Sequence, residues 1–140
     1  MRIFLDANIL FSAAKSPGAI KRLLGLLADA RHECWVDEFV ITEARRNLEQ
    51  KAPSGLAALD RLLKRLRVAP LGTPGTALDA ALPLAEKDRP ILAAAIGLAC
   101  DVLVTGDRTH FGALYGRSIG GVTIHSPRSL AEALWGPAGR

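Results

Sequence analysis

Residues 87–111 read KDRPILAAAIGLACDVLVTGDRTHF, and the order of features in this stretch decides the fold. Asp88 precedes an apolar segment of small residues, and Pro90 is tolerated only in the first turn of a helix, so a helix is expected to begin near Asp88. Residues 101–107 then predict a short buried strand that delivers Asp107 to a loop. The stretch is therefore a helix followed by a strand, with a carboxylate at the edge of each.

Each of these two acids also has a purely structural interpretation. Asp88 is suited to cap the helix, because a short acceptor side chain satisfies free backbone N–H groups there. Asp107 follows Thr105 and Gly106, where an aspartate is a typical turn residue. Taken singly, such acids are more often structural than catalytic, so a chemical role has to come from the rest of the chain.

Length and composition predict one compact domain over residues 1–140. The chain has 49% hydrophobic residues, enough for a substantial core, and 18 basic against 14 acidic residues give a net charge of +4. This charge is compatible with a polyanionic partner without requiring one. Cys34 and Cys100 lie in apolar contexts and predict buried free thiols in a reducing compartment. Neither a targeting segment nor a membrane span is recognisable, so a cytoplasmic location is expected.

Strand and helix signals alternate along the chain. Strands are predicted at residues 2–5, 33–36, 68–71 and 121–124, and helices at 16–31, 38–52, 54–67, 88–100 and 126–134. The first of these helices has Ser16 as its N-cap, a turn-rich connector covers residues 72–76, and a short helix is expected to break near Pro83. The region 108–116 is expected to be a loop or single helical turns. This alternation indicates an α/β fold with a largely parallel sheet.

The predicted order of strands and helices places four acids at one edge of the sheet. Asp6 and Asp107 each come directly after a buried strand, so they meet at the carboxyl edge if those strands are neighbours. Asp88 lies at a helix start on the same rim, and Glu43 reaches it if its helix leans inward. Clustered carboxylates raise one another's pKa, and a hard divalent cation with oxygen ligands, Mg²⁺ or Mn²⁺, resolves the repulsion.

Asp6 has the least evident structural role of the four acids. We therefore expect Asp6→Asn, which relieves repulsion at almost unchanged shape, to melt at or above the wild-type temperature without metal.

Four segments together resemble the PIN domain, and in particular its branch of bacterial VapC-like toxins. They are IFLDAN at 3–8, ITEARRNL at 41–48, KDRPILAAA at 87–95 and LVTGDRTHF at 103–111, and GVTIHSP at 121–127 resembles the ending of that branch. The resemblance implies a three-layer α/β/α sandwich around the parallel sheet. It also implies a metal-dependent endoribonuclease, usually the toxin held in check by an antitoxin and often a homodimer.

Carried over by position, Asp6, Glu43, Asp88 and Asp107 match the acidic cluster of that family. Asn8 and Thr105 match polar positions beside it. The implied Mg²⁺ or Mn²⁺ polarises the scissile phosphate of RNA and activates a water, leaving a 5′ phosphate and a 3′ hydroxyl. Basic residues near the acids in sequence are candidates for RNA contact: Lys15, Arg45, Arg46, Lys87, Arg89, Arg108 and His110.

The chain departs from some relatives after Asp107, where Arg108, Thr109 and His110 stand in place of a further acid. The basis for a second tightly bound ion is therefore weaker. His110 is open to three interpretations, as a phosphate contact, a proton donor or a surface residue.

Two other functions remain in competition with the ribonuclease. One is a PIN-like module that binds nucleic acid or protein without cleavage, which the full set of four acids disfavours. The other is a phosphotransfer domain of the receiver or haloacid dehalogenase type, which also places acids at strand ends. It is disfavoured because the first strand ends in Asp6-Ala-Asn8 and lacks a second aspartate.

Overall fold

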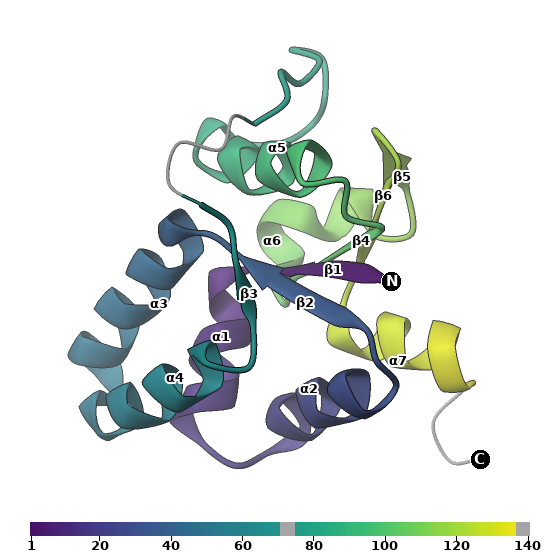
Figure 1. The fold of residues 1–140 in the computed structure, drawn as a ribbon. Helices are drawn as coiled ribbons and strands as arrows, with labels where there is room; N and C mark the ends of the chain where they lie inside the picture. Colours follow the sequence, from purple (N-terminus) through teal and green to yellow (C-terminus); the bar gives the residue numbers. More distant parts are fainter. Residues whose placement is uncertain (71–74, 137–140) are drawn as a thin grey trace.

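A mostly parallel sheet forms the centre of the computed structural model, which describes residues 1–70 and 75–136 (Figure 1). Within these residues the sheet has six strands in the order β3-β2-β1-β4-β6-β5. All neighbouring pairs are parallel except β5 and β6, which form an antiparallel hairpin. The strands are β1 (Arg2–Leu5), β2 (Glu33–Val36), β3 (Arg67–Val68), β4 (Val102–Val104), β5 (Ser118–Ile119) and β6 (Val122–His125).

Helices cover both faces of this sheet. In Figure 1, α5 lies above the strands, whereas α1, α2, α4 and α7 lie below them. The helices are α1 (Ala7–Lys15), α2 (Ala19–Asp29), α3 (Glu38–Lys51), α4 (Leu56–Leu63), α5 (Arg89–Gly97), α6 (Arg108–Phe111) and α7 (Pro127–Trp135). Contacts of α1 with α2, α3 and α4 tie the lower layer together. The predicted α/β/α sandwich is confirmed.

The two innermost strands are β1 and β4, and their sequences explain why. Ile3, Phe4 and Leu5 are fully buried, as are Leu103 and Val104, because continuous apolar runs suit strands that are covered on both faces. Leu5 pairs with Val104, so the residues that follow both strands emerge side by side. From β1 the chain builds outward to β3 and then returns to β4 on the other side. This reversal creates the crevice in which parallel sheets place functional groups.

The prediction for the first helix was wrong in its start. A separate helix, α1, begins immediately after Asp6, whose side chain caps it, and Ser16 ends α1 instead of starting the next helix. The following helix α2 starts after Gly18, with no side-chain cap. Asp6 was interpreted only as the end of a strand, although the apolar pattern of Ile9, Leu10, Ala13 and Ala14 already gives one helical face.

Other boundaries also differ from the predictions. The helix expected at 54–67 is shorter, because Pro53–Gly55 form a 3-10 turn before α4 and residue 67 already belongs to β3. No helix forms within residues 75–85. The antiparallel strand β5 was missed. Part of the predicted third strand and most of the connector at 72–76 lie outside the described residues.

Two general expectations from the sequence can also be compared with the structure. Cys34 and Cys100 are buried free thiols, as predicted, and burial raises the pKa of each to about 11. Across the described parts of the chain, none of the helices has the length and apolar character that crossing a bilayer requires.

Candidate functional site

Asp6 is the most firmly held of the predicted site residues. It is 4% exposed, and its carboxylate accepts hydrogen bonds from the Ala7 N–H at 2.7 Å, the Thr105 hydroxyl at 2.7 Å and the Asn8 amide at 3.3 Å. The interpretation that Asp6 has little structural role was wrong, because one carboxylate caps α1 and joins β1 to the end of β4. Hydrogen bonds within the fold therefore satisfy the Asp6 carboxylate.

Asn8 and Thr105 hold the loop after β4 against the start of α1. The Asn8 carbonyl oxygen accepts the Gly106 N–H at 2.9 Å, and its amide also donates to the Thr105 hydroxyl at 3.2 Å. The same hydroxyl accepts the Asp107 N–H at 3.1 Å. Tyr115, which the sequence gave no reason to select, donates from its hydroxyl to the Thr105 carbonyl at 2.8 Å. This network fixes the backbone from which Asp107 projects.

Asp88 occupies the N-cap position of α5 but caps nothing with its side chain. The residue is 7% exposed, and its Oδ2 is a buried atom without a hydrogen-bond partner. The purely structural interpretation of Asp88 as a helix cap is therefore wrong. A buried carboxylate oxygen without a hydrogen bond is costly, and its neighbour His110 Nδ1 lies 3.6 Å away, beyond hydrogen-bond distance, so the position of Asp88 calls for another explanation.

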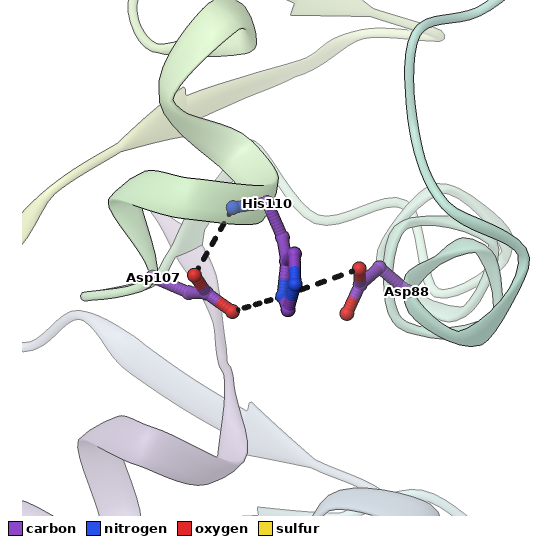
Figure 2. Close-up of side chains that lie close together, drawn as sticks. All are labelled: Asp88, Asp107 and His110. Atoms are coloured by element: carbon purple, nitrogen blue, oxygen red, sulfur yellow. Dashed lines mark hydrogen bonds and ion pairs between the residues drawn. The ribbon is translucent and has the colours of Figure 1, made fainter.

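Asp107, Asp88 and His110 form a compact group at the carboxyl edge of the sheet. Figure 2 shows the His110 ring between the two carboxylates. Its Nδ1 lies 2.5 Å from Asp107 Oδ2 and 3.6 Å from Asp88 Oδ2. One ligand atom from each residue lies within 4.8 Å of the others. His110 is about a third exposed, and its contacts with both carboxylates favour a role in this group over that of a simple surface residue.

Electrostatic effects connect this group to the other two acids. Burial raises the pKa of Asp88, the charges of His110 and Lys87 lower it, and Asp107 and Glu43 raise it again. Burial likewise raises the pKa of Asp6, its hydrogen bonds lower it, and Asp88 and Asp107 raise it. Glu43 is exposed on α3, near enough to act on Asp88 by charge. The structure therefore brings Asp88, Asp107 and His110 together, with Asp6 and Glu43 in their electrostatic surroundings.

The basic residues predicted for RNA contact differ in how free they are. Arg89 donates to the carbonyls of Leu84, Asp79, Ala80 and Leu82, so it secures the segment before α5. Arg45 forms an ion pair with Asp60 at 3.1 Å. The remaining lysines and arginines of that set are exposed: Lys15, Arg46, Lys87 and Arg108.

A shallow hollow of about 330 Å³ opens beside the acids. Asn8, Ser12, Ile20, Gly106, Asp107 and Pro127 are among its lining residues. Its walls come from the starts of α1 and α7 and from the loop after β4. Ser12, Ile20 and Pro127 were not selected from the sequence, because nothing in their spacing indicates that α1, α2 and α7 meet there.

A divalent cation fits the donors that the structure gathers. Asp88 Oδ2 is buried and has no hydrogen-bond partner, and it faces Asp107 and His110 (Figure 2). Carboxylate oxygens are the ligands that Mg²⁺ and Mn²⁺ prefer. The arrangement can therefore hold such an ion, with Asp88 and Asp107 as its first two ligands.

The chain is similar to known proteins in sequence and in fold. A family model described as PIN domain matches residues 2–109, which include all four predicted acids. The fold is similar to that of a chain in a solved structure, described as VapBC2 from Rickettsia felis bound to a DNA fragment from their promoter. The TM-score is 0.63 and the sequence identity is 19%, and the match covers 90% of this chain and 98% of that chain. No curated protein matches. Since the family model covers most of the chain, the protein belongs to the PIN domain family.

Proposed function

We propose that the protein is a divalent-metal-dependent endoribonuclease and acts as a VapC-like toxin. The observation that carries the proposal is the buried Asp88 Oδ2, which has no hydrogen-bond partner and faces Asp107 and His110 at the carboxyl edge of the sheet. Membership of the PIN domain family supports a nuclease, and it disfavours the phosphotransfer alternative.

Asp88 and Asp107 would hold the ion, Mg²⁺ or Mn²⁺, and Asp6 and Glu43 would add negative charge around it. Such an ion supplies a polarised phosphate and an activated water for phosphodiester hydrolysis. Asp6, Asn8 and Thr105 keep the loop after β4 in place, so the Asp107 carboxylate is positioned before substrate arrives. The expected fragments carry a 5′ phosphate and a 3′ hydroxyl.

We place the RNA path along the exposed cations that adjoin the acids. Lys87 lies next to Asp88 in the chain, and Arg108 follows Asp107. Arg46 is exposed further along α3, and Lys15 lies in the last turn of α1, at the end away from Asp6, so both would contact RNA only beyond the acids. Phosphate contacts of this kind supply affinity without reading sequence. The hollow beside Asn8 and Asp107 offers room for part of a nucleotide next to the acids. Arg45 and Arg89 are left out of this path because protein groups already engage them.

An antitoxin is the proposed partner, and one groove suits it. This groove, of about 670 Å³, has an apolar floor that includes Leu24, Leu62 and Leu66, and the exposed cations Lys21, Arg61, Lys64 and Arg65 belong to its lining. Its charge complements an amphipathic segment with acidic flanks. The solved structure of similar fold is described as VapBC2, which supports a partner of the antitoxin class. A homodimer and a cytoplasmic location are further parts of this proposal.

The chemistry of the cut ends tests the proposed reaction. Purified protein is incubated with a pool of single-stranded oligoribonucleotides and Mg²⁺ or Mn²⁺, and both new ends are identified. Fragments with 5′ phosphate and 3′ hydroxyl ends, absent when excess chelator is present, are expected. Fragments with 2′,3′-cyclic phosphate ends would contradict hydrolysis by an activated water. RNA that is bound but never cut with either ion would favour the non-cleaving module.

A further inference from the structure

His110 occupies a position that the family comparison does not cover. The matched segment ends at residue 109, one residue before it. The imidazole lies between the carboxylates of Asp107 and Asp88, with its Nδ1 directed at both (Figure 2). Two observations therefore coincide here: an imidazole nitrogen lies inside the acidic cluster, and the Asp88 oxygen facing it is buried without a hydrogen-bond partner.

The backbone holds this ring in place. Asp107 is the N-cap of α6 and its Oδ1 accepts the His110 N–H at 3.1 Å. The second oxygen of the same carboxylate contacts Nδ1. Because positions three apart in a helical turn lie on one face, Asp107 and His110 form a paired unit that faces Asp88 across the crevice.

The spacing of the three ligand atoms suits one ion. In six-coordinate geometry with bonds of about 2.1 Å, neighbouring ligand atoms lie roughly 3 Å apart. The observed separations of Nδ1 from the two carboxylate oxygens, 2.5 and 3.6 Å, lie on either side of that value. All three ligand atoms lie within 4.8 Å of one another, so an ion between them requires the contact of Nδ1 with Asp107 to open and the side chains to adjust around it.

We infer that His110 Nδ1 is a metal ligand together with Asp88 and Asp107, and that this mixed nitrogen and oxygen site prefers a first-row transition-metal ion such as Mn²⁺ over Mg²⁺. The inference rests on the proposed function, in which the acids hold a divalent ion. Imidazole binds transition-metal ions well, whereas Mg²⁺ favours oxygen ligands and retains its waters. The competing interpretation is that His110 is only a counter-ion for the acids, which a metal displaces.

The test uses Mn²⁺ as the probe and does not depend on activity. Pulsed EPR of Mn²⁺ bound to the wild-type protein detects a directly coordinated nitrogen as ¹⁴N coupling. Titrations then give Kd for Mn²⁺ and Mg²⁺ in wild type, in His110→Gln and in the matched control His32→Gln, since His32 contacts the N-terminal amine. We expect ¹⁴N coupling in wild type and His32→Gln, its loss in His110→Gln, and a preference for Mn²⁺ that falls about tenfold or more in His110→Gln.

The outcomes separate the two proposals. Tight Mn²⁺ binding to wild type without ¹⁴N coupling would overturn the role of His110 and leave the carboxylate site standing. The same conclusion would follow if His110→Gln bound both ions more tightly, because a displaced counter-ion competes with the metal. Failure of wild type to bind either ion would overturn the proposed function itself. The wild-type spectrum is decisive even if His110→Gln does not fold.

Discussion

Asp6→Asn should destabilise the metal-free protein, which reverses the expectation from sequence. The carboxylate accepts from the Ala7 N–H through Oδ1, and from Thr105 and Asn8 through Oδ2. An asparagine has one acceptor oxygen and one NH₂ group, so in either orientation at least one of these donors faces another donor. A hydrogen bond to a charged acceptor contributes about 1.5–3 kcal/mol, and a buried group left unsatisfied adds to the loss.

The substitution also has a stabilising effect, because it removes a buried negative charge that lies near two other acids. Burial and the charges of Asp88 and Asp107 raise the pKa of Asp6, which shows that the ionised carboxylate is disfavoured there. We expect the hydrogen bonds to outweigh it, leaving a net loss of about 1–2 kcal/mol, which lowers Tm by roughly 3–8 °C in a chain of this size.

Thermal unfolding in excess chelator measures this difference, with Asp88→Asn as the matched variant. Asp88 makes no capping bond and its Oδ2 has no hydrogen-bond partner; the exchange removes its 3.6 Å ion pair with His110, but burial of the charge is the larger effect on Asp88, so Tm should stay unchanged or rise. An Asp6→Asn protein as stable as wild type would show that relief of buried charge dominates and would refute the reasoning.

Three further predictions concern stability. Arg89→Met removes four hydrogen bonds to carbonyls and should cost about 2–3 kcal/mol in chemical denaturation, whereas unchanged stability would return Arg89 to the RNA path. Gly120→Ala should cost roughly 1–2 kcal/mol, since its φ is +58° and a Cβ would lie 2.9 Å from Ile96 Cδ1; an unchanged Tm would contradict this. The pKa of Asp88 is raised above its ordinary 3.8, so the ionised form destabilises the fold at neutral pH and this penalty disappears as pH falls toward 3.8. In chelator, the amount by which the Tm of Asp88→Asn exceeds that of wild type should therefore become smaller as pH is lowered toward 3.8. A difference that grows as pH falls would contradict this prediction.

Much of the fold was predictable because its strands carry strong local signals. The apolar runs before Asp6 and Asp107 are typical of strands buried in the middle of a parallel sheet, and the observed sheet has their strands as neighbours. Asp37 and Ser126 begin helices where a capping residue precedes an apolar pattern, and both cap with their side chains. Such features depend on residues close together in the sequence.

What could not be predicted depends on contacts between distant segments. The role of Asp6 follows from Thr105, which lies 99 positions later in the chain. The lack of a helix at 75–85 accompanies the hydrogen bonds from Arg89 to that segment, which no local pattern encodes. His110 was open to three interpretations because its partner Asp88 comes from another helix. Spacing identified the acids, whereas side-chain geometry decided which of them form the candidate site.

Asp88 is proposed to hold a metal ion that RNA cleavage requires. The most direct measurement is the rate of RNA cleavage against Mn²⁺ concentration for wild type, Asp88→Asn and the control Asp29→Asn, whose acid is exposed at the end of α2. We predict that wild type and Asp29→Asn cleave with the same Mn²⁺ dependence and stop in excess chelator. Asp88→Asn should lose cleavage by orders of magnitude while its Tm in chelator is retained. Cleavage by Asp88→Asn at the wild-type rate, or undiminished cleavage by wild type in excess chelator, would contradict the account.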